Sequence, residues 1–210
     1  MLVLDILEKL QDGLNKKYSA NWKGIRTPTE FQTECILETA ELIECIRIKW
    51  WKHNPPNWEK AKLELVDILH FALSGAMLTK GIQSVEMPQG VDVESLKILF
   101  KLAMDNKFVD IIHVLIHFAN LLDFDIISYY VAKFTLNKIR LLLGYRDGTY
   151  QKVIEGVEDN DLVLRCILPS ATRIRLDEEC DISKYEQVAK NVYDMYGIPT
   201  DQRFTLQSYI

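Results

Sequence analysis

Four acidic residues form two pairs with the same spacing, Glu38 with Glu41 and Glu64 with Asp67. A spacing of three places both carboxylates of a pair on one face of a helix. The second pair borders the stretch 65–78, which is so apolar that a helix there would have almost no polar face. A carboxylate on such a helix is costly to bury unless it is paired, protonated or bound to a metal ion. These acids are therefore a candidate functional site.

The elements that carry the acids can bring them together. Helical periodicity predicts helices over 30–52, with Thr29 as cap or first-turn residue, and over 58–79. The segment NPPN at 54–57 separates them, because proline cannot continue a helix. Two helices joined by so short a turn pack antiparallel. Four carboxylates facing one another would repel unless a cation lay between them, and an all-oxygen ligand set favours Mg²⁺ or Mn²⁺. A charged face toward solvent is the alternative for the first pair.

A second group of polar side chains lies on and just after a helix predicted over 124–143: Lys133, Asn137, Arg140, Tyr145 and Lys152. The first three share one stripe of that helix, because they are four and three residues apart. Arginine could grip phosphate as a fork and lysine as a point charge. A solvated face is again the alternative. Together, an acidic cage for metal and a basic stripe are the two halves of a metal-assisted phosphate-transfer site.

Composition excludes several other classes of protein. The chain has 210 residues and a formal net charge of −5, which supplies no broad cationic field for a nucleic-acid polymer. Its four cysteines show no CxxC spacing, so we expect reduced thiols in a cytoplasmic protein without an export signal. No stretch reaches the roughly 18 apolar residues that a membrane span requires. We therefore expect a soluble protein that does not bind membranes.

Helical patterns account for most of the chain. Beyond the helices already given, the spacing of apolar residues predicts helices at 2–18, 92–104, 107–122, 159–168 and 181–196. Strand signals are nearly absent. The sequence therefore predicts one all-α domain over 1–210, a multi-helix bundle whose central antiparallel helix pair carries the metal-binding carboxylates. A smaller mobile helical part is expected around 83–122 and a helical extension at 170–210. The long apolar surfaces at 58–80 and 107–122 favour a homodimer.

Other side chains invite specific interpretations that the sequence does not settle. His113 and His117 are four residues apart on a predicted helix, but they lack a third zinc ligand of obvious spacing, so hydrogen-bonded histidines are favoured. Trp50 and Trp51 could stack on a nucleobase, although adjacent tryptophans at a helix end more often pack against the protein.

Several segments resemble one known family in the right order. ETAE (38–41) followed by ELVDILHF (64–71) resembles the E-x-x-E…E-x-x-D pattern of the all-α nucleotide pyrophosphatases, the MazG-like and dimeric dUTPase group. The likeness to the dimeric dUTPases extends to LQDGLN (10–15), IKWWK (48–52) and KFTLNKIRLLLGYRDGTYQKVIEGVEDND (133–161). It covers most of residues 7–165. The part from about 170 onward carries no motif that we can assign.

The resemblance implies a function and a set of roles. It implies hydrolysis of dUTP, and of dUDP, to dUMP by a metal-bound water in a homodimeric enzyme. Two or more Mg²⁺ ions would be held by Glu38, Glu41, Glu64 and Asp67. The phosphates would be reached by Lys133, Asn137, Arg140, Tyr145 and Lys152. The deoxyuridine pocket would be lined by Gln11, Asn15, His70 and one of Trp50 and Trp51.

The chain departs from the family pattern near the implied base pocket. Ile48 stands where the branch usually has tryptophan, and Phe134 where it usually has asparagine. Glu44-Cys45 replaces the usual Asp-Ser. These changes bear on the choice of base more than on hydrolysis. Two alternatives therefore stay open: a broader pyrophosphatase that acts on dCTP or modified nucleotides, and a non-catalytic helical interaction module.

Overall fold

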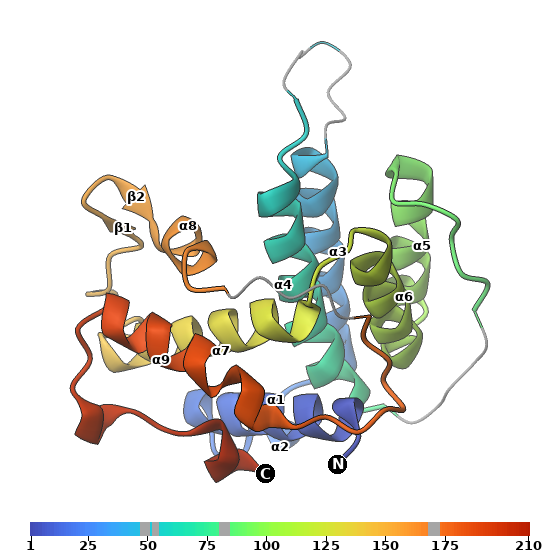
Figure 1. The fold of residues 1–210 in the computed structure, drawn as a ribbon. Coiled ribbons are helices and arrows are strands. Elements are labelled where there is room, and N and C mark those ends of the chain that lie inside the picture. Colours follow the sequence, from blue (N-terminus) through green and yellow to red (C-terminus); the bar gives the residue numbers. More distant parts are fainter. Residues whose placement is uncertain (47–50, 52–54, 80–84, 168–172) are drawn as a thin grey trace.

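Helices form almost all of the regular structure. The computed structural model describes residues 1–46, 51, 55–79, 85–167 and 173–210. Its α-helices are α1 (Val3–Tyr18), α2 (Trp22–Ile25), α3 (Pro28–Cys45), α4 (Trp58–Ala76), α5 (Val93–Met104), α6 (Phe108–Leu121), α7 (Ile126–Leu142), α8 (Asp159–Leu164) and α9 (Glu186–Met195) (Figure 1). Short 3-10 helices lie at Ile182–Tyr185, Thr200–Gln202 and Leu206–Tyr209. The predicted all-α architecture is confirmed.

The two helices that carry the acids form an antiparallel pair. The backbone N–H of Asn57, just before α4, donates to the carbonyl oxygen of Cys45 at the end of α3 at 2.8 Å. The Cys45 thiol also lies 4.0 Å from a carboxylate oxygen of Glu64, in the second turn of α4. Farther along, the Cys35 thiol lies 4.0 Å from the carbonyl oxygen of Ile68. Residue numbers thus fall along α3 as they rise along α4, as the short connection predicts.

The start of α3 differs from the prediction. The helix begins at Pro28, and Thr27 rather than Thr29 precedes its first turn. The backbone N–H of Thr27 donates to the Glu30 carboxylate at 2.8 Å, and its hydroxyl donates to the same group at 3.1 Å. Proline suits the first helical position, because that residue needs no N–H donor and its φ is already helical. The capping box therefore sets the start two residues earlier.

Most other boundaries agree with the predicted ones to within a few residues, which is the scatter of helix ends in general. The helix predicted up to residue 52 is described as far as Cys45, and much of its predicted last turn lies outside the described residues. The helix predicted at 159–168 ends at Leu164. The helix predicted at 181–196 begins as a 3-10 turn and becomes α9 at Glu186.

A small hairpin was not predicted. Strands β1 (Val153–Ile154) and β2 (Val157–Glu158) pair antiparallel. The two turn residues between them, Glu155 and Gly156, have φ of 50° and 81°, as hairpin turns of type I′ require. Strands of two residues carry no periodic signal, which is why the sequence did not reveal them. The hairpin returns the chain so that the N–H of Asp159 bonds to the carbonyl oxygen of Lys152 at 2.8 Å.

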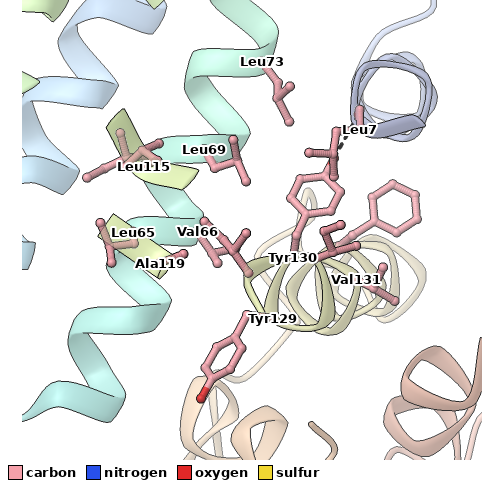
Figure 2. Close-up of a cluster of buried hydrophobic side chains, with 14 of the residues drawn as sticks. Leu7, Leu65, Val66, Leu69, Leu73, Leu115, Ala119, Tyr129, Tyr130 and Val131 are labelled. Carbon is pink, nitrogen blue, oxygen red and sulfur yellow. Dashed lines mark hydrogen bonds between the residues drawn. The ribbon is translucent and has the colours of Figure 1, made fainter. Parts of the chain in front are cut away.

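Helix α4 lies at the centre of the core. Its side chains meet those of α1, α6 and α7 in one apolar cluster (Figure 2). The residues labelled there are Leu7, Leu65, Val66, Leu69, Leu73, Leu115, Ala119, Tyr129, Tyr130 and Val131. Nearly every position of α4 from Ala61 to Ala76 is buried, including that of Glu64, which is 5% exposed. The expectation that this helix has almost no polar face is thus confirmed.

The part from residue 173 onward packs against the bundle. Helix α9 lies alongside α7, and the chain then continues toward α1 (Figure 1). An isolated bridge joins Leu2 to Glu179. Leu206 is fully buried. Within 173–210 only α9 and the three short 3-10 helices are helical, so the extension predicted as helical at 170–210 is helical in part. The mobility expected around 83–122 stays a prediction.

No helix in the described part of the chain is by itself long and apolar enough to cross a bilayer, although α6 and α7, bent by 115° at their junction, pass that test by length and composition as a pair.

Gly75 offers a test of how tightly α4 and α6 pack. A Cβ built at Gly75 would lie 2.5 Å from the ring of Phe108, which is 1% exposed and cannot move aside. We expect Gly75→Ala to lower the free energy of unfolding by about 1–3 kcal/mol through overpacking, in spite of the better helix propensity of alanine. Urea denaturation measures the change.

Gly90→Ala is the matched control. A Cβ at Gly90 meets no atom within 4 Å. We expect its effect to stay within about 0.5 kcal/mol. Equal stability of the two variants would mean that the α4–α6 contact is looser than described.

Candidate active site

Three of the four predicted acids converge. One carboxylate oxygen from each of Glu38, Glu41 and Glu64 lies within 4.8 Å of the other two. Ligands of one Mg²⁺ are about 3 to 4 Å apart, since each bond is about 2.1 Å long. The all-oxygen donor set and its spacing therefore fit a hard divalent cation. Asp67 lines the same cleft, but its Oδ2 accepts a hydrogen bond from Lys133 Nζ at 2.6 Å.

The convergence of the acids changes their protonation. Burial, followed by the charges of Asp67, Glu41 and Glu64, raises the pKa of Glu38 to about 8. Burial, followed by the charge of Asp67, raises the pKa of Glu64 to about 7. Without a cation the group therefore retains protons near neutral pH. A divalent cation would replace those protons and allow the carboxylates to ionise together.

Opposite the acids, two cations are held in fixed positions by an Asp-Asn pair. The guanidinium of Arg140 binds both carboxylate oxygens of Asp159, at 2.7 and 2.8 Å. The side-chain oxygen of Asn160 accepts from Lys133 at 3.0 Å and from Arg140 at 3.1 Å. Burial alone would raise the pKa of Asp159, but Arg140 and the hydroxyl of Tyr150 lower it below its usual range. Asp159 therefore stays ionised and orients Arg140.

Asp159 and Asn160 received no role from the sequence, although both belong to the motif at 133–161. Their place in that motif is the signal that could have identified them. Periodicity could not, because the hairpin that returns the chain to α7 carries no periodic pattern. Asn137, also predicted, accepts from Arg140 at 3.0 Å. Tyr145, which is 40% exposed, and Lys152 both line the cleft. The ammonium of Lys152 lies 5.9 Å from the centroid of the Tyr145 ring.

A buried network of hydrogen bonds occupies the other end of the cleft. The Gln11 amide nitrogen donates to Ser74 Oγ at 3.1 Å and to Asn15 Oδ1 at 2.9 Å. Its oxygen accepts from the Tyr130 hydroxyl at 3.0 Å and lies 2.6 Å from His70 Nδ1. Asn15 also donates to Ser74 at 2.9 Å, and the Ser74 hydroxyl donates to the carbonyl oxygen of His70. Ser74 and Tyr130 were not predicted as site residues.

This network fixes the state of His70. Because the Gln11 oxygen can only accept, the proton of the imidazole is on Nδ1 and Nε2 is a bare acceptor. Burial lowers the pKa of His70 to about 3, with smaller contributions from Lys133 and Arg140, so the ring is neutral. Nε2 is buried and has no hydrogen-bond partner among the described residues. A hydrogen-bond donor on a ligand would satisfy this atom.

One cleft of about 900 Å³ contains both ends. That is a size typical of small-molecule sites. Of the predicted residues, the structure brings together Gln11, Asn15, Glu38, Glu41, Glu64, Asp67, His70, Lys133, Asn137, Arg140, Tyr145 and Lys152.

The aromatic lining of the cleft differs from the prediction. Trp50 lies outside the described residues. Trp51 is 62% exposed and is not among the described residues that line the cleft. Trp22, Phe31 and Phe71 line it instead, and the ring centroids of Trp22 and Phe31 are 6.0 Å apart in an edge-to-face contact. The sequence offered no periodic signal for this group, which combines α2, α3 and α4.

The raised pKa of Glu38 predicts how stability depends on pH. A carboxyl with a folded pKa of about 8 and an ordinary unfolded value binds more protons when folded, so stability falls as pH rises from about 4.5 to 8. Glu38→Gln removes this loss. Without divalent cations, we expect the variant to melt above wild type at pH 8 and equally at pH 5. Thermal unfolding measures both. Mg²⁺ should raise the wild-type melting temperature at pH 8 more than that of the variant.

Glu94→Gln on α5 controls for removing a charge. Glu94 lies on a solvent-exposed face, with a side chain 79% exposed, and pairs only with the exposed Lys97 in the described structure. Its melting temperature should follow wild type at both pH values, with and without Mg²⁺. Identical behaviour of the two variants would contradict a special electrostatic environment at Glu38.

Comparison with known families identifies the chain. No individual curated protein matches it. A family model named dUTPase_2, described as dUTPase, matches residues 3–145, which is more than half of the sequence. The matched part runs from α1 through α7 and contains the acids, the Gln11 network and Arg140. The chain therefore belongs to the dUTPase family of the all-α type and is a dUTP diphosphatase.

Proposed function

We propose that the cleft hydrolyses dUTP, and also dUDP, to dUMP with the help of Mg²⁺, for which Mn²⁺ could substitute. The observation that carries this proposal is the juxtaposition, in one cleft, of three converging carboxylates and two oriented cations. Glu38, Glu41 and Glu64 would hold the metal, with Asp67 as a further ligand once Lys133 releases it. When bound, the ion would neutralise the polyphosphate and acidify a coordinated water.

The side chains then have separate tasks. Glu38 is our choice for the group that orients or deprotonates the attacking water, because its carboxylate belongs to the acidic cluster beside which that water would be bound. Lys133 and Arg140 would contact the phosphates and stabilise the charge on the leaving group. Asp159 and Asn160 keep these two cations in place before the substrate arrives. No covalent intermediate is needed.

The choice of base is inferred from His70. Nε2 can only accept a hydrogen bond, and uracil offers a donor at N3 where cytosine offers an acceptor. If the base lies against this atom, uracil gains one hydrogen bond and cytosine faces a repulsive contact. The bare acceptor therefore favours dUTP over dCTP, the main alternative substrate.

A homodimer was expected from the apolar surfaces of α4 and α6. Within the described residues these helices bury their apolar faces against neighbouring helices of the same chain. The dimer is therefore proposed on the family resemblance alone, and its test is the mass of the protein in solution.

Replacing one acid tests the metal site. We expect Glu64→Gln to lower the rate of dUMP release by on the order of a hundredfold or more, because it removes a charge needed to hold the metal. Its circular dichroism should remain that of wild type. Release of dUMP should require Mg²⁺ or Mn²⁺. The exposed Glu94→Gln variant should keep full activity, and full activity of Glu64→Gln would refute the assignment of the acids.

Replacing His70 tests the choice of base. His70→Phe retains the ring that stacks on Tyr130 but removes the acceptor. The value of kcat/KM for dUTP should fall about tenfold, the size of one hydrogen bond. The value for dCTP should change less, so that the ratio between the two substrates shrinks. An unchanged ratio, or a wild-type enzyme that prefers dCTP, would show that His70 does not select uracil.

A further inference from the structure

We propose that residues 199–210, called here the 199–210 segment, position the base end of the cleft, formed by the Gln11–His70 network, through a continuous series of contacting aromatic rings. The proposal rests on the proposed function, since it concerns the same cleft. The segment lies beyond the matched part of the chain, which ends at residue 145. It runs from the end of the α9 region toward α1 (Figure 1).

The segment contributes two rings to a cluster on α7. Phe204 meets Phe134 edge-to-face, with ring centroids 5.5 Å apart, and Tyr209 meets the same ring at 5.6 Å. Phe204 and Tyr209 also meet each other edge-to-face at 5.3 Å. All three pairs have the geometry that aromatic rings prefer. Phe134 is fully buried, so removing a neighbouring ring would leave a cavity into which it could shift.

A lysine fastens the two rings to α7. The ammonium of Lys138 lies 3.8 Å from the ring centroid of Phe204 and 4.1 Å from that of Tyr209. Both distances are well inside the range of cation–π attraction, which acts while Lys138 is protonated; burial lowers the pKa of this lysine to about 7. Lys138 directly follows Asn137, which belongs to the basic stripe. The segment is thus fixed to the helix that carries the basic half of the cleft.

The same segment also contacts α1. A Cβ at Gly13 would overlap the ring of Tyr209, so the ring occupies the space that this glycine leaves open. Lys9 donates a hydrogen bond to the carbonyl oxygen of Ile210 at 3.0 Å. Gly13 lies between Gln11 and Asn15, which belong to the hydrogen-bond network of the base end. The segment therefore bridges the two helices whose relative position sets that network.

The series of ring contacts continues from Phe134 to His70 in the cleft. Phe134 stacks on Tyr130 at 6.1 Å with an interplanar angle of 23°, and Tyr130 stacks on His70 at 4.4 Å and 27°. The Tyr130 hydroxyl donates to the Gln11 oxygen that fixes the His70 tautomer. Two rings therefore separate the 199–210 segment from the acceptor proposed to choose the base. Displacement of Phe134 would displace Tyr130 and loosen both Gln11 and His70.

Enzyme kinetics distinguishes positioning from simple stabilisation. Phe204→Leu and Tyr209→Leu remove one ring each but keep apolar bulk. Well below the melting temperature and at saturating Mg²⁺, we expect KM for dUTP to rise about five- to tenfold, because the base end of the cleft would be less well ordered before substrate binds. The value of kcat should stay within about threefold. The preference for dUTP over dCTP should fall. Tyr209→Phe, which keeps the ring, should behave as wild type.

Leu206→Val is the matched control. Leu206 is fully buried in the same segment but contributes no ring. The Leu206→Val substitution should lower the melting temperature and leave KM and the substrate preference unchanged. If the two ring variants behave like this control, the segment only stabilises the fold and the proposal is wrong. If Phe204→Leu does not fold, Lys138→Met, which removes the charge from between the rings, serves in its place.

A measurement without substrate separates this proposal from the proposed function. Nitrogen NMR of the His70 ring reports its tautomer. Wild type and Leu206→Val should show a single Nδ1–H form, and the ring variants a mixture. A wild-type protein that does not hydrolyse dUTP would refute the proposed function, while the mixture would still support the coupling. A single tautomer in every variant would overturn the coupling itself.

Discussion

The site depends on the cost of bringing several negative charges together away from water. Glu38 and Glu64 meet in a partly buried acidic cluster, where burial, followed by the charge of Asp67, raises the pKa of Glu38 to about 8 and that of Glu64 to about 7. Two lysines offset part of this cost: Lys133 bonds to Asp67, and Lys60 lies 3.9 Å from Glu64. The rest must come from outside the chain. The same cost that opposes ionisation therefore gives the cleft its affinity for a cation.

The apolar surroundings of α4 keep this cost high. The helix is packed on nearly all sides, so Glu64 cannot turn toward solvent to avoid its neighbours. Helix α7 packs beside it and supplies Lys133 and Arg140, which contact Asn160, and Tyr130, which contacts Gln11 and packs on Phe134. One helix thus faces the phosphate end with cations and the base end with rings. Packing in the core, rather than loop conformation, fixes how far apart these two ends lie.

Helical periodicity predicted the acids and the basic stripe because each set belongs to one or two long helices, where spacing alone decides which side chains share a face. Features built by distant segments could not be found that way. Asp159 and Asn160 arrive through a hairpin of two-residue strands, and Ser74 acts only with Gln11 from α1. The departure at Phe134 was visible in the sequence. The contacts that Phe134 makes with the rings of the 199–210 segment were not visible, because Phe204 and Tyr209 are 70 and 75 residues away in the sequence.

The two ends of the cleft differ in whether their polar side chains are already free to bind a ligand. At the base end every polar group of the Gln11 network is satisfied and only Nε2 of His70 awaits a donor. At the phosphate end, Lys133 is engaged with Asp67. A cation that takes Asp67 as a ligand would free the ammonium for a phosphate oxygen, so the metal and the substrate would each favour the binding of the other. Such coupling needs no movement of a helix, because exchanging the partners of one buried lysine is sufficient.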